Sequence, residues 1–276
     1  MTKPELALWG NNDGTGRSYR HPFRTTEDDK PLTSPSVTTI LKLVDKGGLS
    51  QWAANLTLEW AVSNAALLLS RSDEDGFRAG RYRWKDVRDE RAEVGTGIHE
   101  TIEAMHTGSW DYPVLDAEQQ AIMEQWRALN ERYEFTPHRT EVTIWNLKED
   151  YAGTADGVWD ILDRESGEFY ENALVDLKTS RSTWPEHWMQ LAALSAADVL
   201  MRKELDGTWV EDPAPDYSTL AIVHLRADHS EVLIENDPVI RELRYRQFTS
   251  YRELWRLGKE VDDALKTRQA PPITAF

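Results

Sequence analysis

Two acidic residues and a lysine stand on neighbouring strands that the sequence predicts. Asp156 belongs to one strand, and Asp176 and Lys178 are two residues apart on the next. Because side chains alternate between the faces of a strand, Asp176 and Lys178 project from one face, roughly 6.5 Å apart, while Val175 and Leu177 point to the other. If Asp156 faces the same way, two carboxylates converge, which is the arrangement that a hard divalent cation such as Mg²⁺ needs.

The elements that must position these residues are predicted to form a mixed α/β domain. We expect a central mixed β-sheet flanked by helices, with residues 1–34 as an irregular segment that has one short hairpin at most. Residues 35–276 are expected to form a single domain, with a helical lobe over about 36–135 and the catalytic sheet and its helices over about 138–276. Periodicity predicts helices over 36–44, 49–69, 86–106, 116–133 and 238–267, with a break at Gly47 and Gly48, and strands over 139–147, 169–178, 219–225 and 231–235.

The order of the polar residues resembles that of the PD-(D/E)XK nuclease superfamily, in its RecB-like and phage lambda exonuclease branch. Three pairs of residues and one single residue support this resemblance, in the order in which the family has them. They are Gly95 with His99 on a predicted helix, Gly153 with Asp156, Asp176 with Lys178, and Gln190 on a following helix. The resemblance covers roughly residues 35–200 and implies a restriction-endonuclease-like core.

The resemblance also implies an activity, a metal-dependent DNA nuclease similar to the exonucleases of phage and bacterial recombination and repair. In that family pattern Asp156, Asp176, His99 and the carbonyl of Leu177 would bind Mg²⁺ or Mn²⁺. Lys178 would orient or deprotonate the attacking water, and a metal beside it would lower the lysine pKa and favour the basic role. Gln190 would position water or phosphate. The expected partners are DNA and, as for other RecB-like domains, an annealing recombinase or a helicase subunit.

Two glutamates are candidates for supporting roles. Glu141, at the start of the first predicted strand of the sheet, is interpreted as an outer carboxylate that acts through water. His99, Glu103 and His106 share one helical face, and the last two match the Glu-x-x-His motif of di-iron bundles. Because that architecture needs a second such motif, which the sequence lacks, Glu103 is interpreted as an acceptor that supports His99.

The charge of the whole chain is acidic, but one segment before His99 is basic. The chain has 32 Lys and Arg against 48 Asp and Glu residues, a formal net charge of −16, which fits poorly with a pure DNA-binding module. The basic segment alternates with Tyr82 and Trp84, and this mixture suits contact with a DNA backbone together with base stacking. Its acidic neighbours leave a solvated helix as an equal alternative. The predicted DNA-binding residues are Arg81, Arg83, Lys85 and Arg88.

Other features of the sequence exclude some functions and leave others open. The chain has no cysteine, so it binds no iron–sulfur cluster through thiolates. Leu194 stands where RecB-like members often carry Tyr, four residues after the Gln. No signal peptide or membrane-spanning run is recognisable, so we expect a cytoplasmic protein, in the host cytoplasm if a phage encodes it. A catalytically inactive DNA-binding or assembly protein with the same fold is the alternative function; exonuclease or endonuclease action, polarity and oligomeric state stay open.

Overall fold

The centre of the molecule is a mixed β-sheet. The computed structural model describes residues 7–8, 16–44, 47–70, 74–109, 113–203 and 207–268. Within these residues the sheet has seven strands in the order β10-β9-β6-β5-β4-β7-β8, all antiparallel to their neighbours except β6 and β9, which are parallel. Their bounds are β4 Tyr133–Asn146, β5 Tyr151–Asp163, β6 Phe169–Lys178, β7 Val199–Lys203, β8 Trp209–Pro213, β9 Leu220–Leu225 and β10 Ser230–Glu235.

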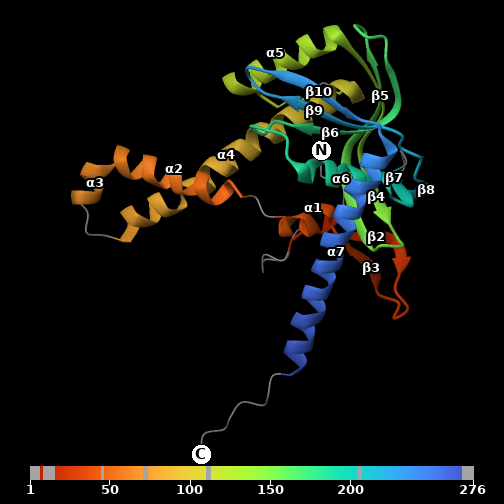
Figure 1. The fold of residues 1–276 in the computed structure, drawn as a ribbon, viewed down its shortest axis with the longest axis horizontal. Helices are drawn as coiled ribbons and strands as arrows, with labels where there is room; N and C mark the ends of the chain where they lie inside the picture. The colour runs from red at the N-terminus through yellow and green to blue at the C-terminus, as the bar shows by residue number, and fades with distance from the viewer. Residues whose placement is uncertain are drawn as a thin grey trace, which may run out of the picture.

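Helices cover both faces of this sheet (Figure 1). One face packs against a layer of three helices and the other against two, so two hydrophobic cores lie on either side of the strands. The first layer is α1 Val37–Ile40, α6 Pro185–Ser195 and α7 Pro238–Thr267, and the second is α5 Ala117–Arg132 with the end of α4 Glu74–Thr107. The predicted α/β class, with a central mixed sheet flanked by helices, is confirmed.

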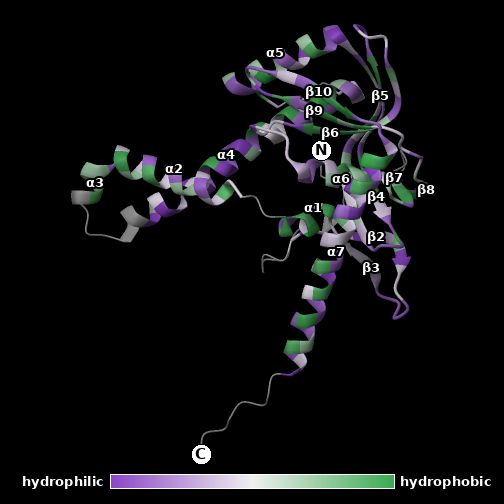
Figure 2. Cartoon of the chain, in the orientation of Figure 1, coloured by the Kyte–Doolittle hydropathy of each residue, from purple (hydrophilic) through white to green (hydrophobic). Residues whose placement is uncertain are grey.

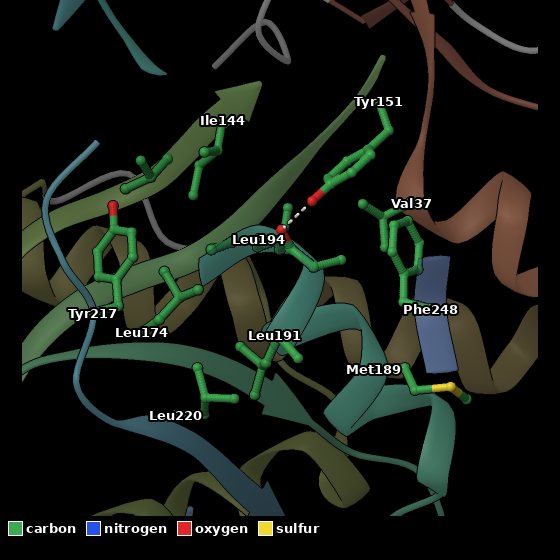
Figure 3. Close-up of a cluster of buried hydrophobic side chains, with 14 of the residues drawn as sticks. Val37, Ile144, Tyr151, Leu174, Met189, Leu191, Leu194, Tyr217, Leu220 and Phe248 are labelled. Carbon is green, nitrogen blue, oxygen red and sulfur yellow. Dashed lines mark hydrogen bonds between the residues drawn. The ribbon is translucent and has the colours of Figure 1, made fainter. Parts of the chain in front are cut away.

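The first core holds α6 firmly against the sheet (Figure 3). Leu174 of β6 and Leu220 of β9 belong to the same buried cluster as Leu191 of α6. The hydroxyl of Tyr151, at the start of β5, donates a hydrogen bond to the carbonyl of Ala193 in α6 at 2.8 Å. This packing fixes the position of α6, the helix that contains Gln190. It therefore also fixes which groups the side-chain amide of Gln190 can contact.

Strand β6 is buried on both of its faces, as its composition predicts. From Ala173 to Leu177 every residue is buried, and the neighbouring strand β9 is buried along its whole length. A central strand with a parallel neighbour is usually an uninterrupted apolar run. Asp176, only 2% exposed, breaks that run. A carboxylate at this position costs folding free energy, which suggests that it is kept for function.

The helices between residues 37 and 132 do not form one lobe as predicted. Helix α1 and the short η1 (Leu41–Leu43) pack on the first face of the sheet, whereas α5 packs on the second. Only α2 (Leu49–Ser63), α3 (Ala65–Ser70) and the first half of α4 project away from the sheet (Figure 1). We call these three segments the arm. None of the described helices is long and apolar enough to cross a membrane.

The N-terminal segment contains the expected hairpin in a small sheet, and the region after α6 contains strands β7 and β8, which the sequence analysis did not predict. A small sheet has the order β1-β2-β3, with bounds Ala7–Leu8, Ser18–Thr25 and Pro31–Pro35, and β2 with β3 is the one hairpin expected there. Residues 1–6 and 9–15 of the predicted irregular segment lie outside the described residues. Strands β7 and β8 extend the large sheet at the β4 edge.

Gly153 of β5 gives a first prediction, because helix α6 lies directly over it. A Cβ atom on Gly153 would be 2.7 Å from Leu194 Cδ2 and 3.4 Å from Val37 Cγ2, and both of these side chains are buried. Gly153→Ala is therefore expected to lower the free energy of unfolding by about 1–3 kcal/mol, measured by urea denaturation. Gly258→Ala is the matched control: this helical glycine has nothing within 4 Å of its Cβ position, so the substitution should raise stability by about 1 kcal/mol. Equal effects at the two positions would contradict the packing argument.

Candidate active site

The site lies where strands β5 and β6 stop pairing. Their regular pairing ends at Gly157 opposite Val175. One step further, the backbone N–H of Leu177 donates to Oδ2 of Asp156 at 2.6 Å. A side-chain carboxylate thus takes the place of a backbone acceptor at this point. The interruption brings Asp156 against the segment of β6 that includes Asp176 and Lys178.

Two ion pairs join the four charged side chains of the site. Nδ1 of His99 lies 3.3 Å from Oδ1 of Asp156, and Nζ of Lys178 lies 2.5 Å from Oδ2 of Asp176. Nε2 of Gln190 donates to the other oxygen of Asp176 at 3.4 Å, a long hydrogen bond. The His99 and Lys178 side chains are 29% and 19% exposed, against 3% for Asp176. A molecule arriving from solvent therefore meets the histidine and the lysine before the deeper carboxylate.

The two carboxylates have opposite pKa shifts. Burial and the nearby charge of Asp156 raise the pKa of Asp176 to about 6, although Lys178 acts in the other direction. For Asp156, burial would raise the pKa, but the charge and hydrogen bond of His99, the charge of Lys178 and the Leu177 N–H together lower it. Asp156 is thus well compensated, whereas Asp176 carries more negative charge than its surroundings balance. An additional cation would correct that imbalance.

Attraction to the carboxylates favours the charged forms of the two cationic side chains. Burial alone would lower the pKa of Lys178, but attraction to Asp176 and Asp156 outweighs it and raises that pKa. The pKa of His99 is likewise raised, because the attraction of Asp156 exceeds the effect of burial. The protein's own groups therefore favour a lysine ammonium, whereas the basic role expected from the sequence needs a lower pKa. A divalent cation beside the lysine would act in that direction.

Gly95 explains how α4 brings His99 to the strands. A Cβ atom at Gly95 would be 2.9 Å from Oγ1 of Thr179, the residue that follows Lys178. The helix therefore approaches the end of β6 as closely as a glycine allows. One turn later along α4, His99 reaches Asp156. The spacing of glycine and histidine on this helix is thus a packing requirement.

Glu141 lies beside Asp156, as the outer-carboxylate interpretation requires. It stands directly across from Asp156, between the pairs Thr140–Gly157 and Val142–Ala155, and its φ of 49° is in the left-handed region. Opposite residues on antiparallel strands project to the same side. Both line a small cavity with room for about one water molecule, and the rest of its lining includes His99, Glu103 and His106.

Glu103 shares that cavity without contacting His99. Among the described residues, no hydrogen bond joins the two side chains, and the ring of His99 faces Asp156 instead. Burial and the charge of Glu100 raise the pKa of Glu103. Glu103 therefore contributes to the charge around the cavity. The described residues show no hydrogen bond from His99 to Glu103, which was the contact predicted from the sequence.

The donor set suits a hard divalent cation in its chemistry, although the ligands are not gathered around a point. Among the described residues, no three His, Asp or Glu side chains converge as a metal-binding group. His99 and Lys178 instead neutralise the two carboxylates from within the protein. Oδ2 of Asp176 is buried and receives no hydrogen bond of regular geometry apart from its ion pair with the lysine. A buried carboxylate with a raised pKa is a favourable place for a cation.

The basic segment of α4 divides into two sides of the helix. His99 lies 11, 14 and 18 residues after Arg88, Lys85 and Arg81, which is about three, four and five helical turns. These three side chains therefore project from the same side of α4 as His99. Arg83 is on the opposite side, where it forms ion pairs with Glu90 and Asp86.

Aromatic side chains accompany the basic side of the helix. Nζ of Lys85 lies 4.6 Å from the ring centre of Tyr82 and 5.7 Å from that of Trp84, and Arg88 lies 5.6 Å from the ring centre of Trp84. Arg88 also pairs with Asp89, in an exposed contact of little energetic value. We call Arg81, Lys85 and Arg88 the basic track.

Another hollow that α4 lines is on a different side of the helix and is acidic. It has a volume of about 500 Å³, and its lining includes Asp89, Glu93 and Glu100. Carboxylates repel phosphate groups, so this hollow is unsuited to a nucleic-acid backbone. The grouping of polar side chains and their charge therefore favour the β5–β6 end over this hollow as the site.

Two residues show what the sequence analysis missed and what it anticipated. His224 of β9 was not predicted: it is paired in register with Lys178, and its Nε2 lies 2.7 Å from the carbonyl oxygen of Ser180. A histidine within the apolar run of a buried strand was the available signal. Leu194, four residues after Gln190, is buried in the core over Gly153 and cannot contact a substrate.

Comparison with known proteins adds little to this geometry. No family model matches the chain. No curated protein matches it either. The solved structure of the protein SSO0001 aligns with 80% of this chain and 81% of its own, at 14% sequence identity and a TM-score of 0.22. A TM-score this low supports no argument about fold or function.

His106, at the far end of the small cavity, gives a prediction about pH. Its ring packs edge-on against Trp159, with 4.8 Å between ring centres, and burial lowers its pKa to about 4. The unfolded chain, with an ordinary histidine pKa near 6.5, takes up the proton first on acidification. The contribution of neutral His106 to stability is thus complete above about pH 6.5 and is lost as the pH falls toward 4.

His106→Phe keeps a ring in place and removes this titration. Urea unfolding at several pH values should show the variant gaining on the unaltered protein as the pH falls from 7 to 5, by up to about 2 kcal/mol. Parallel stability curves for the two proteins would contradict the assignment of a neutral, buried ring.

Proposed function

We propose that this protein is a metal-dependent deoxyribonuclease that hydrolyses phosphodiester bonds. The observation that supports this best is the group at the β5–β6 end, where Asp156 and Asp176 lie on adjacent strands with Lys178, Gln190 and His99 around them. These residues come from four elements, with Asp176 and Lys178 both on β6, and the fold brings the four elements together. The order of the residues and their grouping in space are consistent with the same activity.

In this proposal the carboxylates and the imidazole hold the cation. Asp156, Asp176, His99 and the carbonyl of Leu177 would bind Mg²⁺ or Mn²⁺, which supplies an activated water and neutralises charge on the phosphate. Asp176, whose pKa is raised to about 6, has the most to gain from such a cation. Glu141, across from Asp156, would hold water at the edge of the site.

In this proposal Lys178 has two roles, one after the other. As an ammonium it attracts the scissile phosphate and stabilises the negative charge that develops on it. A cation bound beside it would lower its pKa, and the neutral amine would then be able to accept a proton from the attacking water. Gln190, which already donates to Asp176, orients that carboxylate.

DNA would reach this site along the basic track of α4. The track begins about 16 Å from His99 at Arg88 and continues to about 27 Å at Arg81, measured along the helix axis. Cationic side chains at these intervals suit successive phosphates, and Trp84 adds a surface on which a base can stack. This route leads a strand from the arm to the two carboxylates. A strand led in along one direction favours exonuclease action, in recombination or repair in a bacterial or phage-infected cytoplasm.

Lys178→Met tests the proposed chemistry. The change keeps the bulk of the side chain and removes its charge, so cleavage of an end-labelled duplex with Mg²⁺ or Mn²⁺ should fall by about 100-fold or more. Lys30→Met, at an exposed position in the loop between β2 and β3, is the matched control and should cleave normally. Circular dichroism of both variants establishes that they are folded.

The outcome also separates the two candidate functions. Cleavage that needs the metal, is abolished by EDTA and is lost in the Lys178 variant supports the nuclease. If the unaltered protein cleaves neither linear nor closed circular DNA with either metal but still binds DNA, the inactive DNA-binding alternative replaces it.

Charge reversal on the basic track tests the proposed route. Arg88→Glu should weaken DNA binding and lower the slope of log K against log salt by about 1, because one phosphate contact is lost. Arg83→Glu changes the same charge on the other side of the same helix and should leave the slope nearly unchanged. Fluorescence anisotropy with a labelled oligonucleotide, across a salt series, measures both. Equal losses from the two changes would show that general charge, rather than the track, attracts DNA.

A further inference from the structure

Helix α7 has one face against the core and an opposite face against solvent. Phe248 is fully buried, and Tyr245, Tyr251 and Trp255 pack around the same core cluster. These residues recur every three or four positions, as expected for the buried stripe of an amphipathic helix. Arg252, on the same side, forms an ion pair with Glu149. The core therefore accounts for one stripe of α7 only.

The opposite face carries a second apolar stripe, and all of it is exposed. Its members recur with the alternating three- and four-residue spacing of the a and d positions of a heptad, over almost four heptads. Six of the eight are apolar. We call this set the α7 stripe: Ile240, Leu243, Gln247, Ser250, Leu254, Leu257, Val261 and Ala264.

The second half of α7 extends beyond the rest of the described protein. Figure 1 shows it projecting away from the sheet, and Figure 2 shows apolar and polar residues alternating along it. Leu254 and Val261 are 59% and 57% exposed. A helix that leaves the core gains little from tertiary packing, and a contiguous apolar stripe on it marks an interaction surface.

The charges beside the stripe fit a second copy of the same helix in antiparallel orientation. Arg246, Glu253 and Glu260 occupy the g positions, and in an antiparallel pair the g positions of the two helices face each other. Arg246 then lies opposite Glu260 of the second copy, and the same contact forms twice. Glu253 lies opposite Glu253 of the second copy, where the ion pair of each with Arg256 of its own chain offsets the like charges. In a parallel pair, g faces e, and Arg246 would meet only Tyr251. Among the described residues Arg246 has no ion pair of its own, and the two helix dipoles also favour the antiparallel arrangement.

The stripe is complementary to itself in the antiparallel register that these charges select. In three of the four layers a small or polar residue then faces a larger apolar one, and in the fourth two apolar residues meet, which lets the two helices approach closely. The layers are Ile240 with Ala264, Leu243 with Val261, Gln247 with Leu257, and Ser250 with Leu254, each formed twice. We propose that the protein is a homodimer in which the α7 stripes of two copies pack as an antiparallel pair of helices. This proposal is independent of the nuclease activity.

The mass of the protein in solution tests the interface. Light scattering after size exclusion should give twice the mass of one chain, and Leu254→Glu with Leu257→Glu should reduce it about twofold, since buried charges oppose association. Leu58→Glu with Val62→Glu is the matched control, because these side chains are 64% and 70% exposed on α2 and lie away from α7. The control should stay dimeric. A monomer at every concentration, or a dimer that survives the α7 change, overturns the proposal.

Cross-linking tests the orientation, because the chain has no cysteine of its own. A Ser250→Cys protein is mixed with a Leu254→Cys protein and oxidised. The antiparallel register places these two positions opposite each other, so the mixed disulfide should dominate. Disulfides only between like chains would indicate a parallel pair and overturn the antiparallel arrangement.

Discussion

The site depends on one hydrogen bond, from the backbone of Leu177 to the carboxylate of Asp156. A sheet normally satisfies each backbone N–H with a backbone carbonyl. At this point a side chain does so, and the two strands no longer need to stay in register. This hydrogen bond holds the Asp156 carboxylate more firmly than a contact at the surface would, because its donor belongs to the buried strand that includes Asp176. The remaining polar residues are arranged around these two carboxylates.

The charges of the site are balanced, but unequally. His99 and Lys178 neutralise two carboxylates, yet the pKa shifts show that Asp156 is satisfied and Asp176 is not. The imbalance follows from depth, since Asp176 is almost completely buried and has a second carboxylate nearby. Buried ionised groups of this kind lower stability and are common at functional sites. The site thus gives up stability in exchange for a ready response to added positive charge.

The sequence predicted the parts of the fold that rest on local patterns. The alternation around Asp176 gave the bounds of β6, and the spacing of apolar residues gave those of α7. Short strands β7 and β8 were missed because five residues at the edge of a sheet carry little periodicity. The arm was mistaken for part of a lobe, since periodicity identifies an apolar face without saying what covers it.

For the candidate site too, the sequence predicted local features but not the contacts between distant segments. Residue types and their order identified His99, Asp156, Asp176, Lys178 and Gln190. Their pairing did not follow from the sequence, because it depends on which strands are neighbours and on the close approach at Gly95.

Helix α4, with 34 residues, is also about 50 Å long, and it connects the arm to the site without a break. The close contact at Gly95 divides α4 into a long part toward the arm and a short part toward the site. If the helix tilts about this contact, the two ends move in proportion to their distances from it. Arg81 lies about 21 Å from that contact and His99 about 6 Å, so a tilt that moves the arm by several ångströms shifts the histidine by only about a third as much.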